Sequence, residues 1–238
     1  MTARWPLNPR SLPKVIAHRG AKAYAPENTL SALRKAAELG ATWVEFDISH
    51  DSRNQPIIFH DTRLHRTTNG RGIVSQTPYS VIRQLDAGSW FSPEFTGEVV
   101  PTFEEWLEEA ARLQMGINIE MKGNKLFSAG LLAEGIVTNL ARYWKSGLAA
   151  PIISSTSLSC LAEVRKRAPY LLLGYVARRW PNNWKKILTR FGCFSFHVNH
   201  RQLNQKRVRE VKDSNYLLLA FTVNDRRRAN ELFDMGVD

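Results

Sequence analysis

Cysteine is scarce in this chain: Cys160 and Cys193 are the only two in 238 residues. They form neither the spacing of a zinc site nor a disulfide framework, and both are expected to be buried thiols in a reducing compartment. No stretch approaches the roughly 18 consecutive apolar residues of a membrane span. The first residues carry prolines and charges but no apolar segment of a signal peptide. These absences predict a cytoplasmic protein without stable membrane insertion.

Several well-known motifs are also missing. The chain has no G-x-G-x-x-G, no P-loop and no G-x-S-x-G, which disfavours nucleotide binding and serine-based hydrolysis. Acidic residues are few in the second part: residues 1–150 hold 17 Lys/Arg and 15 Asp/Glu, whereas residues 151–238 hold 16 and 7. The basic residues are spread over several predicted helices and form no single tract. No RNA-binding signature accompanies the aromatic-rich residues 90–106, so we expect no nucleic acid partner.

What the chain does contain is an alternation of short apolar runs and amphipathic helical patterns. Helical spacing covers Asn28–Leu39, where Asn28 or Thr29 can cap, and Phe103–Leu113, which begins with a capping-box pattern. Repeated strand-then-helix units with nearly continuous apolar strands predict a parallel sheet covered by helices. In a chain of this length they favour a TIM-type (β/α)₈ barrel over an open sheet. The predicted strands are Lys14–Ala17, Trp43–Ile48, Ile117–Lys122, Ile152–Ser155, Leu171–Val176, Cys193–Val198 and Leu217–Val223.

Three segments depart from this alternation. Pro56–His60 follows the second strand too closely for a helical crossover, so it is expected to be the return arm of an excursion from that strand. Residues 62–100 are rich in turn formers and aromatics, and they predict a small inserted lobe over one end of the barrel. The sequence ends at GVD (236–238), where an apolar eighth strand is expected to begin, so that strand is predicted to be missing. The prediction is one barrel domain over residues 1–238 that contains the lobe.

Carboxylates alternate along two of the predicted strands. In WVEFDI, the two-residue period of a strand puts Glu45 and Asp47 on one face, and in INIEMK it aligns Asn118, Glu120 and Lys122. Like charges inside a barrel need a cation between them. Three carboxylates from two strands form an all-oxygen site, which suits Mg²⁺ or Ca²⁺ rather than zinc. Lys122 would lie about 6–7 Å beyond Glu120 along the strand, where it can hold an anion that touches the metal.

Two histidines also end apolar runs. His18 and His60 are each followed by a charged residue. One histidine in such a place is more often structural, but two beside a divalent metal and a lysine can divide the roles of acid and base near neutral pH. His50 and His65 lie in predicted polar loops and are expected to be inert, and the roles of His197 and His200 are left open.

These residues resemble one family, the glycerophosphodiester phosphodiesterases. The resemblance implies a TIM-barrel enzyme that splits small-molecule glycerophosphodiesters into sn-glycerol 3-phosphate and an alcohol. The resemblance is strongest to the small cytosolic bacterial members. The matching motifs occur in the same order as in the family and cover nearly the whole chain. The matching motifs are HRG…PENT (18–29), EFD (45–47), HD (60–61), TNG (68–70), DAGSWF (86–91), PTFEE (101–105), IEMK (119–122), ISS (153–155), FTVN (221–224) and GVD (236–238).

The same resemblance implies roles for single residues. By this match, His18, His60 and Lys122 would be catalytic; Arg19, Lys122 and Phe221 would contact substrate; Glu45, Asp47 and Glu120 would bind the metal; and Glu27 and Asn28 would lie near the metal or substrate. Phe221 stands where many relatives have tryptophan. We favour His18 as the base and His60 as the acid. Neither Mg²⁺ nor Ca²⁺ is preferred.

Two alternatives stay open at this point. A lysophospholipase D-type activity would need an apolar rim or anchor for an acyl chain, and the sequence offers no anchor. The second alternative is not an enzyme: it is a truncated, inactive, basic protein that acts by binding a partner. An absent eighth strand would expose two strand edges, which would also favour homo-oligomers.

Overall fold

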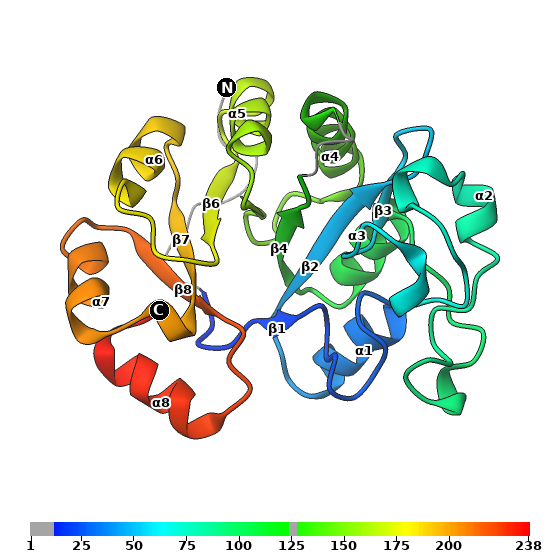
Figure 1. The fold of residues 1–238 in the computed structure, drawn as a ribbon, viewed down its shortest axis with the longest axis horizontal. Coiled ribbons are helices and arrows are strands. Elements are labelled where there is room, and N and C mark those ends of the chain that lie inside the picture. Colours follow the sequence, from blue (N-terminus) through cyan, green and yellow to red (C-terminus); the bar gives the residue numbers. More distant parts are fainter. Residues whose placement is uncertain (1–11, 124–127) are drawn as a thin grey trace.

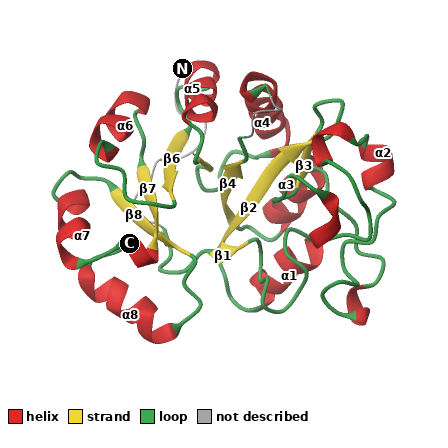
Figure 2. Cartoon of the chain, in the orientation of Figure 1, coloured by secondary structure: helices red, strands yellow, loops and turns green. Residues whose placement is uncertain are grey.

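A curled parallel sheet forms the centre of the fold (Figure 1). The computed structural model describes residues 12–123 and 128–238, and within them seven parallel strands follow one another in chain order, each hydrogen-bonded to the next. Helices cover the outer face of the sheet (Figure 2). The predicted α/β fold with a curled parallel sheet is thus confirmed. The strands are β1 (Ala17–His18), β2 (Trp43–His50), β4 (Gly116–Met121), β5 (Ile152–Ser155), β6 (Leu172–Ala177), β7 (Ser195–Asn199) and β8 (Leu217–Phe221).

Side-chain oxygens cap most of the longer helices. Thr29 accepts a hydrogen bond from the amide of Ala32 at the start of α1, and Thr102 and Glu105 form the predicted capping box of α3. None of the described helices is both long and apolar enough to cross a membrane. The helices are α1 (Leu30–Glu38), α2 (Tyr79–Ile82), α3 (Phe103–Arg112), α4 (Ala129–Tyr143), α5 (Leu158–Arg167), α6 (Trp184–Phe191), α7 (Gln205–Lys212) and α8 (Arg226–Met235).

The main apolar core lies between the sheet and these helices. On β2 the apolar side chains of Val44, Phe46 and Ile48 belong to this core and are fully buried. The ring of Phe46 packs 4.8 Å from that of Trp106, which fixes α3 on the outer face of β2. Because side chains alternate along a strand, the polar residues between these apolar ones face the inside of the curled sheet.

The first predicted strand is largely wrong. Lys14–Ala17 was expected, but the strand is Ala17–His18, and both Lys14 and Val15 are exposed. Ala17 pairs with Val44 and His18 with Glu45, so β1 pairs with the first residues of β2. In the described residues β1 has no strand on its other side. The other predicted strands agree with the structure to within two residues at each end.

The excursion from β2 is confirmed. β3 (Pro56–Ile58) runs antiparallel to β2, with Ile58 opposite Ile48. The segment that follows contains α2 and several short 3₁₀ turns. It contributes to a second, small apolar cluster, separate from the main core. That cluster comprises Ile57, Phe59, Leu64, Val74, Ile82, Ala87 and Val100.

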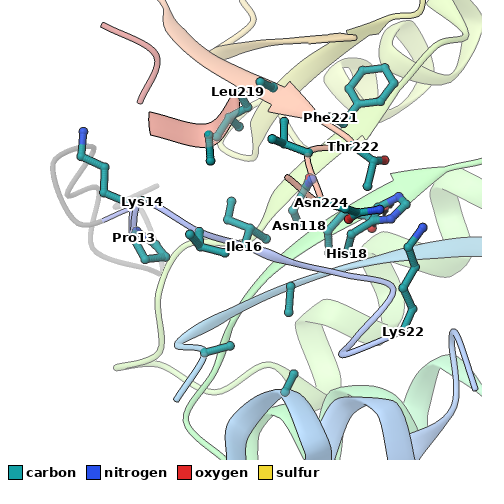
Figure 3. A pocket seen from close by; sticks show the side chains of 18 of the residues that line it. Pro13, Lys14, Ile16, His18, Lys22, Asn118, Leu219, Phe221, Thr222 and Asn224 are labelled. Carbon is teal, nitrogen blue, oxygen red and sulfur yellow. Dashed lines mark ion pairs between the residues drawn. The ribbon is translucent and has the colours of Figure 1, made fainter. Parts of the chain in front are cut away.

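The sheet is open between its first and last strands. Within the described ranges no strand lies between β8 and β1, and a cavity of about 640 Å³ occupies this side of the molecule (Figure 3). The amide of Asp238 donates to the carbonyl of Leu218, so the chain returns to the side of β8 at this point. One end of the cavity reaches His18 and Glu45, which connects the open side of the sheet with the polar residues inside it.

Candidate active site

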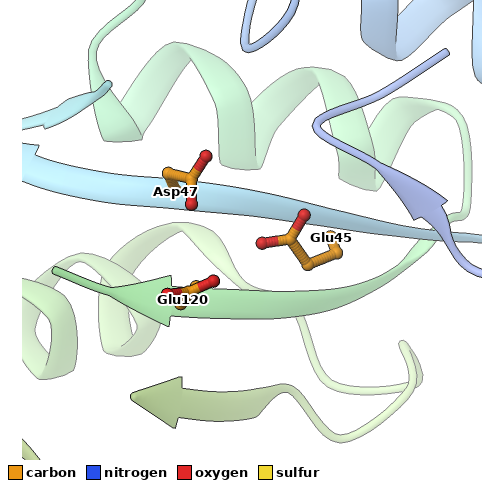
Figure 4. Close-up of side chains that lie close together, drawn as sticks. All are labelled: Glu45, Asp47 and Glu120. Carbon is orange, nitrogen blue, oxygen red and sulfur yellow. The ribbon is translucent and has the colours of Figure 1, made fainter. Parts of the chain in front are cut away.

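Three carboxylates meet inside the sheet. Glu45 and Asp47 extend from β2 and Glu120 extends from β4, with Asp47 and Glu120 opposite each other in the strand register (Figure 4). One oxygen of each side chain lies within 4.8 Å of the others. The predicted alternation therefore brings these three residues together on the inner face of the sheet.

Two cations balance this negative charge. Lys122 Nζ lies 2.7 Å from Asp47 Oδ1 and 2.6 Å from Glu120 Oε1, and Arg19 Nε lies 3.1 Å from Asp47 Oδ2. Asp47 is fully buried, and burial alone would raise its pKa, but Lys122 and Arg19 hold that pKa well below its usual range. Lys122 was expected further along the strand; its long side chain instead reaches back to the carboxylates.

Glu45 is the carboxylate of the cluster that forms no ion pair with Arg19 or Lys122. Burial, together with the neighbouring Asp47 and Glu120, raises the pKa of Glu45 well above its ordinary value. Its Oε1 is buried and has no hydrogen-bond partner among the described residues, and the same holds for Oδ1 of Asn118, which is opposite Glu45 in the strand register. Unpaired buried oxygens beside a carboxylate cluster suit a hard divalent cation, so the donor set fits the expected metal.

The two expected histidines lie close to the cluster, His18 at the end of β1 and His60 two residues after β3. His18 Nε2 is 3.8 Å from Glu45 Oε2, and His60 Nδ1 is 2.5 Å from Asp61 Oδ1. Burial, followed by the nearby Arg19, lowers the pKa of His18 to about 3. Burial also lowers the pKa of His60, although Asp47 and Asp61 oppose that effect. Both rings are therefore neutral at pH 7 in the protein without ligands.

Arg66 is a site residue that the sequence did not indicate. Its Nε lies 2.5 Å from Asp61 Oδ2 and its Nη2 lies 2.7 Å from Glu27 Oε1. The same Glu27 oxygen is 2.7 Å from Nη1 of Arg19. A continuous chain of ion pairs thus runs from Arg19 through Glu27 and Arg66 to Asp61, the partner of His60.

The turn after β1 holds its residues in an unusual backbone conformation. Arg19 and Asn28 have φ angles of 58° and 59°, which residues other than glycine rarely adopt. The amide of Asn28 donates to the carbonyl of Arg19 over 3.0 Å, and Asn28 Nδ2 donates to Asp47 Oδ2 over 2.9 Å. Asn28, expected near the metal or substrate, thus contacts the carboxylate cluster directly.

Two further candidate residues, Phe221 and His197, line the large cavity. Phe221 ends β8 and lines the large cavity (Figure 3). His197 lies on β7, buried, with Nε2 2.8 Å from Ser195 Oγ. The expectation for His50 was wrong: it is the buried last residue of β2 and not part of a polar loop, because β2 extends two residues further than its apolar pattern indicated.

Acid is expected to destabilise the protein through its buried histidines. Burial lowers the pKa of both His18 and His197 to about 3. The unfolded chain, with a histidine pKa near 6.5, then binds protons that the folded chain does not, so the free energy of unfolding falls as the pH drops below 6.5. Between pH 7 and pH 5 we expect a loss of about 2 kcal/mol for each such histidine.

Urea unfolding at several pH values measures this loss. His197→Gln should reduce the fall between pH 7 and pH 5, whereas His65→Gln, which removes an exposed histidine, should not. An equal pH dependence in wild type and His197→Gln would contradict the account of this buried ring.

Residues 18–238 match the model of the glycerophosphoryl diester phosphodiesterase family. The chain belongs to that family. The family predicted from the sequence motifs is therefore confirmed, and with it the class of enzyme, a phosphoric diester hydrolase. The match begins at His18 and includes the three carboxylates and both histidines described above.

Individual glycerophosphodiester phosphodiesterases resemble the chain over most of its length. A relative from Caldanaerobacter subterraneus, named a glycerophosphodiester phosphodiesterase, is 32% identical to this chain. The alignment covers 94% of this chain and 91% of the relative. YhdW of Bacillus subtilis is 33% identical with the same two coverages. The solved structure of an Oleispira antarctica phosphodiesterase in complex with the product sn-glycerol-3-phosphate has a TM-score of 0.93 and 35% identity, over 95% of this chain and 91% of that one.

Proposed function

We propose that this chain hydrolyses glycerophosphodiesters to sn-glycerol 3-phosphate and an alcohol, with one divalent cation, Mg²⁺ or Ca²⁺, held by Glu45, Asp47 and Glu120. The observation that carries the proposal is the meeting of these carboxylate oxygens within 4.8 Å, with two histidines that are neutral at pH 7 within electrostatic reach of them. The product bound to the Oleispira antarctica phosphodiesterase supports the same substrate class.

Charge is the first barrier to this reaction, because a phosphodiester anion repels an attacking oxygen. A bound divalent cation would neutralise part of that charge and stabilise the charge that develops in the transition state. Arg19 and Lys122 supply further positive charge beside the carboxylates, at the place where the non-bridging oxygens would bind. The ion pairs of Arg19 with Glu27 and Asp47 fix the direction of its guanidinium group before substrate arrives.

The two histidines move the protons. His18 is held neutral at pH 7 by burial and Arg19, so a ring nitrogen is free to accept a proton from water or from the glycerol hydroxyl of the substrate, and we assign it as the base. Asp47 and Asp61 both act to raise the pKa of His60 against its burial. His60 is therefore the ring that gains a proton more readily once the anionic substrate binds, and we assign it as the acid that protonates the departing alkoxide.

Residues 62–100 form, in this proposal, an inserted lobe that supports the site. The separate apolar cluster of this region supports the assignment, as does the reach of Arg66 from the region to Glu27 and Asp61. Arg66 then acts as a positioning residue, because it holds Asp61 against His60.

Arg66→Ala is expected to lower kcat by about tenfold, because Asp61 would lose the partner that orients it toward His60. Arg66→Lys should restore part of the loss. Arg63→Ala, an exposed arginine in the same region, is the matched control and should retain wild-type kinetics. A kcat for Arg66→Ala equal to that of Arg63→Ala would contradict the positioning role.

The products of glycerophosphocholine cleavage test the proposed function. The purified protein is incubated with this substrate and divalent cation, and the products are identified by chromatography. Equal amounts of sn-glycerol 3-phosphate and choline are expected. Phosphocholine and glycerol would mean that the other phosphoester bond is cut, and no turnover by folded protein would favour a non-catalytic, basic interaction protein.

A further inference from the structure

Among the described residues, one cation at the site differs from the others in forming no ion pair. Arg19 and Lys122 each form ion pairs with two carboxylates, and Arg66 bridges Glu27 and Asp61. Lys22, in the turn that follows β1, forms no ion pair or hydrogen bond with any residue that the structure describes.

Lys22 nevertheless points into the catalytic end of the cavity. Its side chain is half-buried and lines the cavity together with His18, Glu45 and Asn118. Figure 3 shows the ammonium end of Lys22 beside the ring of His18. After burial and Arg19, the charge of Lys22 is the next cause of the lowered pKa of His18, so the two groups are within electrostatic reach of each other.

A half-buried ammonium without a partner is costly. The pKa of Lys22 is lowered, first by burial and then by Arg19, because the site already has a cation there. Glu27, Glu45 and Asp47 oppose this lowering, but none of them forms an ion pair with Lys22. A lysine side chain without an ion pair ordinarily extends its ammonium group into water. Its direction toward His18 is explained if an anion joins it when ligand is bound.

We propose that Lys22 is an anion-binding residue of the cleft that contacts an anionic oxygen of the bound glycerophosphodiester. The inference rests on the proposed function and names a residue that selects the substrate. Two parts of a substrate carry such oxygens: the phosphate itself and, in some glycerophosphodiesters, the departing alcohol. With the phosphate as partner, Lys22 would strengthen the binding of every substrate and of sn-glycerol 3-phosphate. With the alcohol as partner, it would favour acidic headgroups alone.

Steady-state kinetics of three variants test this inference. Lys22→Gln is expected to raise KM by about tenfold with kcat changed less than about threefold, the pattern for loss of a binding contact. Lys22→Arg should restore KM. Lys14→Gln is the matched control, since Lys14 lines the other end of the same cavity (Figure 3) and its removal changes the net charge equally.

Two substrates distinguish the two sources of the anion. A higher KM for both glycerophosphocholine and glycerophosphoserine would place Lys22 on the phosphate. A higher KM for glycerophosphoserine alone would place it on the carboxylate of the departing serine. Kinetics of Lys22→Gln that equal those of Lys14→Gln for both substrates would overturn the inference.

Calorimetric binding of sn-glycerol 3-phosphate separates this inference from the proposed function. If wild type binds the compound but does not turn over substrate, weaker binding by Lys22→Gln alone would still support the anion contact to the phosphate, while the catalytic proposal would fail. If wild type neither binds nor hydrolyses, both fail. Equal binding by wild type and Lys22→Gln, together with unchanged KM values, would remove Lys22 from the site and leave the proposed function intact.

Discussion

Glu45→Gln is expected to abolish the response of the protein to Mg²⁺ or Ca²⁺ without lowering the stability of its metal-free form. Burial, Asp47 and Glu120 raise the pKa of Glu45 well above the value it has in an unfolded chain. A raised pKa contributes stability at low pH that is lost as the pH rises through the folded-state value, so at pH 7 the ionised unfolded chain is favoured. Glutamine has the shape of the protonated side chain and carries no such penalty, but it is a far weaker ligand for a hard cation.

Thermal unfolding at pH 7 checks this result. In EDTA, the Tm of Glu45→Gln should equal or exceed that of wild type, and added Mg²⁺ or Ca²⁺ should raise the Tm of wild type only. Hydrolysis should fall by at least about a thousandfold, as expected when a main electrostatic contributor is removed. Glu134→Gln, on the exposed face of α4, controls for the change of charge. A metal-induced rise in Tm that is the same in Glu45→Gln and in wild type would contradict the assignment of the metal site.

His60→Ala is the second change with a large expected effect. Loss of the acid that protonates the departing alkoxide should lower kcat by about 10²- to 10⁴-fold. Binding of sn-glycerol 3-phosphate should change little, because the carboxylates and Lys122 do not depend on His60 for their ion pairs.

The control for His60→Ala is His65→Ala, an exposed histidine five residues further along the same segment. Its kinetics should match wild type. If kcat for His60→Ala stays within about tenfold of wild type, the loss is smaller than the one usually seen when a general acid is removed. That result would remove this ring from the chemistry.

The carboxylate cluster could be predicted from the sequence because strand geometry is local. Once WVEFDI is assigned to a strand, the two-residue period puts Glu45 and Asp47 on one face, whatever the rest of the fold does. Parallel neighbours then bring Glu120 beside them. The same reasoning failed where no pattern exists: Lys22 lies in a turn and Arg66 in a short 3₁₀ helix, and their positions depend on how those segments pack against the sheet.

The errors in the predicted strands have a related cause. Apolar character at Lys14–Ala17 indicated a strand, but a strand needs a partner, and β1 pairs with β2 only at Ala17 and His18. His50 was assigned to a loop because its neighbours are polar, yet pairing with Pro56 on the return strand keeps it in β2. Hydrogen bonds to a neighbouring strand, which composition does not reveal, set these boundaries.

Metal-dependent cleavage by this carboxylate and histidine site is tested most directly by one titration. Protein stripped of metal with EDTA is assayed with glycerophosphocholine, and the release of sn-glycerol 3-phosphate is followed enzymatically as Mg²⁺ or Ca²⁺ is added. We predict no release without metal and saturable recovery with at least one of the two cations. Full turnover in EDTA, or none with either cation from folded protein, would contradict the assignment of Glu45, Asp47 and Glu120 as a working metal site.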